Sequence, residues 1–437
     1  MRRTFVVLVG LLVSLLVPVS AEAGRGGFPP GFLWGVSVDG FEHEGSFPDS
    51  NWTRYARAGG SRDPYADSAD FRHRYRSDLK LAHSLGVTTF RTSVEWARVE
   101  PRPGKYDWKE IHYYDDLVRR MRSYGMRPIL ELSHFVHPGW VADQGAWTNQ
   151  RTVDQWLRFA RFIVNRYKSD KKHKGEQAIW ITFNEASYYI LDELRNKGLT
   201  LAQVPTMQAN LIKAHRAAYD MIHRVDPGAP VTASVAWSTI LNPLFDDALF
   251  NHVTDKIDFI GLDYYLGSSL LNASVVLALT GEYWRIRPEP DGLYHVLRNY
   301  HRRFPKLPFF ILENGANTDN GKPQADGYTR SQFIRDHLYW VQRAQQEGIR
   351  VLGYSYWSLI DGYEWGSYRP RFGLYTVNVR TDPALRRRPT PAAADYRAII
   401  RRNGLPSGYR PVKPPAWCTV QDPLATCFGI TPTPPLP

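Results

Sequence analysis

Short, uninterrupted apolar runs recur along the chain, separated by longer stretches in which apolar residues follow helical spacing. Runs of this kind are typical of parallel strands that are buried on both faces. The eight runs lie at residues 32–38, 88–94, 127–133, 178–183, 230–235, 258–262, 308–312 and 351–356. The pattern therefore predicts eight strands.

The stretches between these runs predict helices, because their apolar residues recur every three or four positions. The clearest lie at residues 69–85, 110–124, 152–167, 206–225, 328–347 and 391–402. Several end at a glycine, such as Gly86, Gly125 and Gly348, which is common at helix C-termini. Eight alternating units predict an α/β fold, a single (β/α)8 TIM barrel over residues 24–404. The competing fold, a doubly wound open sheet, usually has a glycine-rich phosphate turn after its first strand, and the sequence has none there.

The first 23 residues have the pattern of a signal peptide. Two arginines precede an apolar run over residues 5–17, and Ala21 and Ala23 form an A-x-A cleavage pattern. The apolar run is too short to be typical of a membrane span. We therefore expect a secreted, extracytoplasmic protein whose mature chain starts near Gly24, with an uncleaved anchor as the alternative.

The last segment, residues 405–437, is rich in proline and predicts an extended appendix to the barrel. It holds the two cysteines of the chain, Cys418 and Cys427. In an exported protein these two predict a disulfide, which would contribute about 2–3 kcal/mol through loop entropy. No cluster of metal-ligating residues accompanies them, and we expect neither a metal nor a cofactor.

The chain is basic, with 55 Lys and Arg against 43 Asp and Glu and a net charge of +12. The charges are scattered, which favours a solvated surface over a nucleic-acid site. A positive exterior could still hold the protein near an anionic cell envelope, an association that moderate salt would weaken.

Two glutamates follow apolar strands and are the first candidates for chemistry. Glu185 ends the fourth predicted strand after Asn184, and Glu313 ends the seventh before Asn314 and Gly315. In a TIM barrel, the C-terminal ends of the strands build the active site. Two carboxylates across one mouth are what glycosidic cleavage needs, since one protonates the leaving oxygen and the other attacks the sugar or activates water.

Around these glutamates the chain resembles glycoside hydrolase family 1, the β-glucosidase family, over nearly its whole mature length. The matching segments are FPPGFLWG at 28–35, FRTSVEWAR at 90–98, LSHF at 132–135, TFNE at 182–185, DFIG at 258–261, LENG at 312–315, YWSLIDGYEW at 356–365 and RFGL at 371–374. The block at 356–365 is the most specific of these.

The resemblance implies a retaining β-glycosidase acting on a small-molecule or oligosaccharide β-glycoside. Glu185 would be the acid/base and Glu313 the nucleophile, with Arg91 holding the nucleophile ionised and Tyr265 hydrogen-bonded to it. The remaining residues that the resemblance places around the sugar are Glu42, His134, Asn184, Trp357, Glu364 and Trp365. Without it, His134 would more often be a structural histidine, and the tryptophans could be rim packing.

Two positions depart from the family pattern, because Glu42 replaces the usual Gln and Asp263 the usual Asn. Both changes add acidity, so the preferred sugar can differ from glucose, and an amino group would be favoured. The segment at 235–258 is also shorter than expected, which predicts a more open acceptor side suited to bulky aglycones or transglycosylation. Two other functions stay open, an endo-acting β-glucanase of the same clan and a secreted carbohydrate-binding protein that has lost turnover.

Overall fold

The computed structural model describes residues 27–169, 177–238, 241–265, 267, 269, 272, 274 and 282–429. The predicted signal peptide, residues 1–23, lies outside the described residues. No described helix is long and apolar enough to cross a membrane.

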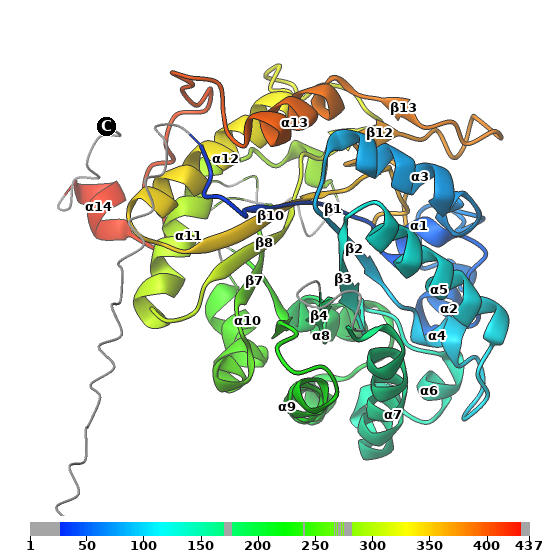
Figure 1. Cartoon of the computed structure of the whole chain (residues 1–437). Helices are drawn as coiled ribbons and strands as arrows, with labels where there is room; N and C mark the ends of the chain where they lie inside the picture. The colour runs from blue at the N-terminus through cyan, green and yellow to red at the C-terminus, as the bar shows by residue number, and fades with distance from the viewer. Residues whose placement is uncertain are drawn as a thin grey trace, which may run out of the picture.

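A parallel sheet forms the centre of the molecule, and its strands run in the order β5-β4-β3-β2-β1-β10-β8-β7-β6 (Figure 1). The strands are β1 (Leu33–Ser37), β2 (Thr89–Ser93), β3 (Arg127–Glu131), β4 (Ile179–Ile181), β5 (Val231–Thr232), β6 (Ser234–Ala236), β7 (Ile260–Asp263), β8 (Phe309–Asn314) and β10 (Val351–Trp357). β5 and β6 are two halves of the fifth predicted strand, separated only by Ala233. The two ends of the sheet therefore meet at one strand, and the predicted (β/α)8 barrel is confirmed.

Alternate residues of the strands pack on opposite faces. Ile129, Ile179 and Phe310 belong to a small apolar cluster contributed by several strands, which fills the inside of the barrel. Their chain neighbours Leu130, Trp180 and Ile311 belong to the large core between strands and helices. This double burial explains the continuous apolar runs in the sequence.

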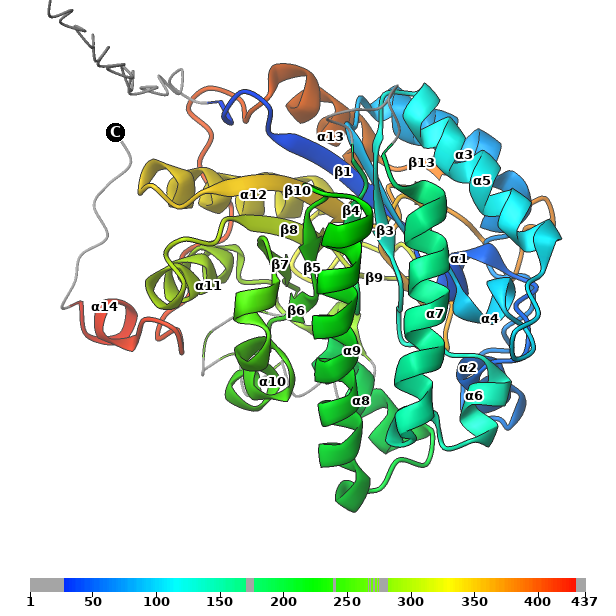
Figure 2. The same ribbon diagram turned by 60° about the horizontal axis from the view of Figure 1, so that its bottom comes forward.

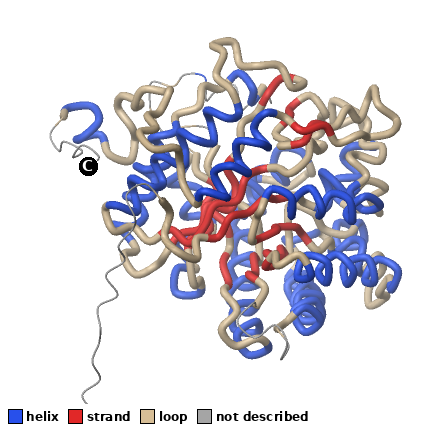
Figure 3. The backbone as a smooth tube through the Cα atoms, turned by 45° about the horizontal axis from the view of Figure 1, so that its top comes forward, coloured by secondary structure: helices blue, strands red, loops and turns tan. Residues whose placement is uncertain are grey.

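Helices surround the strands, as the tube in Figure 3 shows. The main helices are α3 (Phe71–Leu85), α5 (Trp108–Ser123), α7 (Gln150–Tyr167), α9 (Val204–Val225), α11 (Pro290–Arg303), α12 (Arg330–Gln346) and α13 (Pro391–Arg402). The six predicted helices are confirmed with small shifts at their ends, and α11 is added. Figure 2 shows α7 and α9 side by side on one flank.

Short elements lie mostly in the connections between the main ones. The short helices are α1 (Gly40–Glu44), α2 (Asn51–Arg57), α4 (Trp96–Val99), α6 (Gly139–Asp143), α8 (Ala186–Asn196), α10 (Asn242–Ala248) and α14 (Pro423–Phe428). The short strands are β9 (Thr318–Asp319), β11 (Pro370–Arg371), β12 (Tyr375–Thr376) and β13 (Arg388–Pro389).

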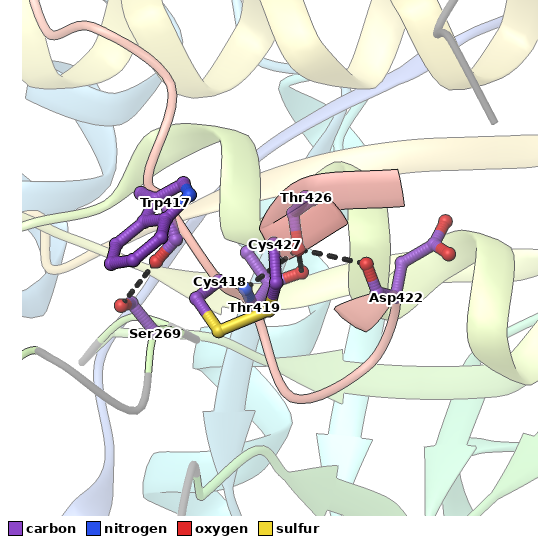
Figure 4. Close-up of a disulfide and its surroundings, with 7 residues drawn as sticks. All are labelled: Ser269, Trp417, Cys418, Thr419, Asp422, Thr426 and Cys427. Atoms are coloured by element: carbon purple, nitrogen blue, oxygen red, sulfur yellow. Dashed lines mark hydrogen bonds between the residues drawn. A yellow bond between two sulfur atoms is a disulfide. The ribbon is translucent and has the colours of Figure 1, made fainter. Parts of the chain in front are cut away.

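The C-terminal segment was predicted to be extended, but it contains a short helix, α14. This helix begins at Pro423, and proline is favoured in the first turn of a helix. Cys418 and Cys427 form a disulfide (Figure 4). Ser269, in the connection after β7, donates to the carbonyl of Trp417 at 2.7 Å. Asp336 of α12 accepts a hydrogen bond from the amide of Val412 at 3.0 Å. The extension is thus tied to the barrel at two points before the cysteines.

Candidate active site

A cavity of about 530 Å³ opens at the C-terminal ends of the strands. The predicted residues among those that line it are Glu42, His134, Asn184, Glu185, Tyr265, Glu313, Trp357, Glu364 and Trp365. Arg91 does not line it, because its side chain is fully buried beneath the floor. Arg91 instead forms an ion pair with Glu313 at 2.5 Å, the residue beside which the family resemblance places it.

Glu185 lies four residues after the end of β4 and directly before the first residue of α8, with φ of 38°. A positive φ is strained for a residue with a side chain and persists only where its surroundings hold it. The hydroxyl of Ser234 on β6 accepts the Glu185 backbone N–H at 2.9 Å. Burial and the charge of Glu313 raise the pKa of the Glu185 carboxyl well above its ordinary value. Such a carboxyl carries a proton where most glutamates are ionised.

Glu313 lies in β8 and is held at both carboxyl oxygens. Oε1 accepts from Nη1 of Arg91 at 2.5 Å, and Oε2 accepts from the hydroxyl of Tyr265 at 2.6 Å. The two donors fix the orientation of this carboxylate. One carboxyl oxygen each of Glu185, Asp263 and Glu313 lies within 4.8 Å of the others.

Asn184 is fixed by two donors to its amide oxygen. Arg91 donates to Oδ1 through Nη2 at 2.7 Å, and Ser234 donates through its hydroxyl, also at 2.7 Å. With Oδ1 occupied, the Asn184 amide nitrogen, 3.4 Å from a ring nitrogen of His134, is the group left to meet a ligand. Asn184 therefore presents a donor to the cavity.

His134 lies between two buried acids, Glu131 and Asp39, and the ring of Trp357. Its Nδ1 lies 2.7 Å from Glu131, and its Nε2 lies 3.6 Å from Asp39. Burial lowers the pKa of His134, but the charges of Glu131 and Asp39 outweigh that effect and raise it to about 9. The ring stacks on Trp357 with 16° between the planes. The imidazole is therefore a cation and a donor in the neutral range.

Two further acids, Glu42 and Glu364, line the cavity together with Trp357 and Trp365. Trp357 donates from its indole nitrogen to Glu364 at 3.1 Å, and Trp365 directs its backbone N–H at Glu42, 3.4 Å away. Burial and the charge of Glu364 raise the pKa of Glu42 well above its ordinary range. Burial and Asp39 raise the pKa of Glu364 to about 8. Trp357 is buried and Trp365 half-buried, and both rings contribute to packing as well as to the cavity wall.

The sequence prediction did not include several residues that support or line this cavity. Glu131 ends β3 and forms ion pairs with both Arg91 and His134. Its signal was a charged residue inside the apolar run 127–133. Ser234 left no comparable signal, because a serine in a strand is common. The outer wall consists largely of aromatic residues that no motif singled out: Trp52, Tyr55, Tyr188, Trp237 and Tyr283.

The short segment between β6 and β7 forms part of this outer wall. It contributes Trp237, Ser238 and Leu241, and the connection after β7 adds Ile286 and Pro288. This part of the cavity lining is therefore shared between two connections. The prediction of a more open acceptor side stays a prediction, because residues 275–281 lie outside the described part.

Three groups of acids and histidines are close enough to ligate a metal ion among the described residues: Asp39, Glu42 and His43; Glu131, His134 and Glu313; and Glu185, Asp263 and Glu313. His43 and His134 are already bound to carboxylates, and Arg91 occupies Glu313. These contacts compete with metal binding in each group. The same carboxyls suit proton transfer.

A parallel barrel with two close carboxylates in a cavity at the C-terminal ends of its strands is an arrangement typical of barrel glycoside hydrolases. Comparison with known proteins agrees with this class. The chain belongs to glycosyl hydrolase family 1, whose sequence profile matches residues 25–243 and 236–405. The resemblance inferred from the motifs is confirmed.

The individual relatives share 30% or less of their aligned residues with this chain in the three comparisons that follow. The chain is 30% identical to the galactolipid galactosyltransferase SFR2 of Arabidopsis thaliana over 73% of its own length, and it spans only 57% of that protein. It is 25% identical to β-glucosidase A of Thermotoga maritima, covering 86% of this chain and 98% of the relative. A structure of a Thermotoga maritima β-glucosidase in complex with deoxynojirimycin shares the fold, with a TM-score of 0.73 and 22% identity over 87% of this chain and 100% of that one.

Proposed function

We propose that the protein is a retaining β-glycosidase of the β-glucosidase type, with Glu313 as nucleophile and Glu185 as acid/base. One observation carries the proposal: carboxyl oxygens of Glu185 and Glu313 lie within 4.8 Å in a cavity at the barrel mouth. Retaining enzymes hold their two carboxyl groups about 5–5.5 Å apart, whereas inverting enzymes leave room for a water between them. A direct attack by Glu313 on the sugar carbon fits this spacing.

The electrostatics support an exchange of roles during the reaction. In the first step Glu313 attacks the anomeric carbon, and Glu185 gives its proton to the leaving oxygen. Glu313 then becomes a neutral ester, and the charge that kept Glu185 protonated is gone. Glu185 can accept a proton from the incoming water, which attacks the anomeric carbon. The bond from this carbon to the Glu313 oxygen breaks, and the sugar leaves with its original configuration.

The glycone is proposed to lie against Asn184, His134, Trp357 and the acids Glu42 and Glu364. Asn184 and His134 offer donors to sugar hydroxyls, and the tryptophan faces offer apolar surface to the ring. Glu42 and Glu364 accept hydrogen bonds when ionised and can also donate when protonated. Their acidity bears on which sugar is preferred.

Secretion is part of the proposal. It rests on the signal-peptide pattern of residues 1–23, and Gly24 is the expected N-terminus of the mature chain. The net charge of +12 supports an association with an anionic cell envelope that moderate salt would release.

A second activity, glycosyl transfer to a sugar acceptor, is favoured by the outer wall. Tyr55, Trp237 and Tyr283 line the cavity, and aromatic faces bind sugar rings. Similarity to a protein named as a galactolipid galactosyltransferase points the same way. An acceptor sugar in place of water would take the glycosyl group from Glu313.

The test uses aryl β-glycosides with the variants Glu185→Ala and Glu313→Ala. Both should lose turnover by several orders of magnitude. Azide should rescue Glu185→Ala with a β-glycosyl azide and Glu313→Ala with an α-glycosyl azide, because azide meets the glycosyl ester in the first and the substrate itself in the second. Asp154→Ala, an exposed acid on α7, is the matched control and should keep full activity.

Azide products of one anomer from both variants would contradict the assignment. Turnover of wild-type enzyme with added oligosaccharide acceptor, followed by mass spectrometry of the products, measures transfer. Free sugar as the sole product at high acceptor concentration would exclude the second activity.

A further inference from the structure

Asp263 is a third carboxyl beside the two glutamates. It is the last residue of β7, is 1% exposed and lines the cavity. One of its oxygens lies within 4.8 Å of oxygens of both Glu185 and Glu313. The reaction proposed above uses two carboxyls and gives Asp263 no task.

Neither oxygen of Asp263 has a hydrogen-bond partner among the described residues. The Ser234 hydroxyl is near enough to lower the pKa of Asp263, but it donates its hydrogen bond to Asn184, as does Nη2 of Arg91. Nη1 of Arg91 and the Tyr265 hydroxyl donate to Glu313. An ionised carboxylate normally collects such donors, so the Asp263 surroundings do not suit a negative charge.

The charges that face Asp263 lead to the same conclusion. Glu313 on β8, Glu185 after β4 and Glu131 on β3 are acids, whereas Arg91 on β2 is the single cation among the groups that shift its titration. Burial and Glu313 raise the pKa of Asp263 well above its ordinary range. A protonated Asp263 removes one negative charge from a crowded, buried set.

We propose that Asp263 is a positioning residue that stays protonated through the catalytic cycle and so lets Glu185 change from acid to base. This inference rests on the proposed function. The decisive moment is the second step. Once Glu313 is a neutral ester, an ionised Asp263 would take its place as the negative neighbour and keep Glu185 protonated. A neutral Asp263 leaves Glu185 free to ionise and to accept the proton of water.

The test compares Asp263→Asn with wild type. Asn has the same shape, cannot ionise and donates a hydrogen bond as a protonated carboxyl does. From acidic to neutral pH its kcat should stay within about threefold of wild type, and the alkaline limb of kcat/KM should not move. Asp263→Ala is also neutral and should likewise leave the alkaline limb of kcat/KM in place, and thermal unfolding of both variants separates any loss of kcat from misfolding.

At alkaline pH the two proteins should diverge. Wild type should accumulate the glycosyl-enzyme, seen by intact mass spectrometry, as Asp263 begins to ionise, and Asp263→Asn should not. Asp291→Asn is the matched control, since Asp291 is also buried, its pKa is raised by burial to about 7, and it does not line the cavity. This control should behave as wild type does.

Opposite results would overturn the inference. If Asp263 is ionised in the resting enzyme, Asp263→Asn removes a negative charge from beside Glu185 and lowers the alkaline limb of kcat/KM by at least one pH unit. If a bound divalent cation balances that charge, a chelator lowers wild-type activity and leaves Asp263→Asn unaffected.

A last measurement does not need turnover. The difference infrared spectrum at neutral pH should show a protonated-carboxyl band in wild type that is lost in Asp263→Asn, while the band of Glu185 stays. If the spectra of wild type and Asp263→Asn contain the same protonated-carboxyl bands, the inference is wrong. This result does not depend on glycoside hydrolysis, so failure of the inference can be told apart from failure of the proposed function.

Discussion

Arg91 divides its two terminal nitrogens between two residues of the mouth. Nη1 donates to Glu313 at 2.5 Å, and Nη2 donates to Asn184 at 2.7 Å. One buried guanidinium thus sets the direction of the proposed nucleophile and of the amide beside the proposed acid/base. Glu131 completes its surroundings as an ion-pair partner.

The first prediction concerns this fork. Arg91→Lys keeps a cation but cannot reach both partners in one plane. We expect kcat/KM to fall by about 10²–10³, the range seen when one preorganised donor is lost from an active site. Arg387→Lys is the matched control, because Arg387 also pairs with a buried carboxyl, that of Asp78, at 2.7 Å, and it does not line the cavity. Wild-type activity in Arg91→Lys would show that the fork is not needed.

The second prediction concerns stability against pH. The pKa of His134 is raised from 6.5 to about 9, so its ion pairs stabilise the fold fully below pH 6.5 and are lost as the pH rises through 9. The free energy of unfolding, measured by urea titration, should fall by about 3 kcal/mol across this window from this group. His134→Asn should lack that component. If the free energy of unfolding of His134→Asn falls with pH as steeply as that of wild type, other groups cause the loss of stability.

The third prediction concerns the extra acid of the wall. Glu42 has a raised pKa because it is buried and faces Glu364, so ionising it above pH 4.5 destabilises the fold. Glu42→Gln should raise the free energy of unfolding at pH 7 on the order of 1 kcal/mol and should change nothing at pH 4. A panel of aryl β-glycosides should show a relative gain for the glucoside. If Glu42→Gln and wild type show the same relative rates across the panel, Glu42 does not contribute to sugar selection.

The fourth prediction concerns the C-terminal disulfide. The bridge between Cys418 and Cys427 closes a loop over a sequence separation of 9, worth about 2–3 kcal/mol by the loop-entropy model. Replacing both cysteines with serine should therefore loosen residues 405–429 without unfolding the barrel. Limited proteolysis should cut this segment faster while activity is retained. Simultaneous loss of activity would show that the extension supports the connection after β7.

Local pattern was enough to predict the barrel and to point to its mouth. A strand that is buried on both faces requires a continuous apolar run, and such runs predicted the positions of all eight barrel strands. The polar residue that ends such a run, as in Glu185 and Glu313, marks the functional end of the barrel. Sequence spacing could not show that Ala233 splits one strand or that residues 423–428 form a helix, because both depend on contacts with distant segments.

The sequence by itself determined the fold class, the family and the pair Glu185 and Glu313, because each is encoded in short segments. The tertiary structure alone decided which groups share the centre. Arg91 and Glu313 are 222 positions apart, so the family resemblance could pair them but no spacing rule could. It also brought Asp263 to the pair, placed Arg91 beneath the cavity and raised the pKa of His134, since burial and opposing charge arise only when distant strands close into a barrel.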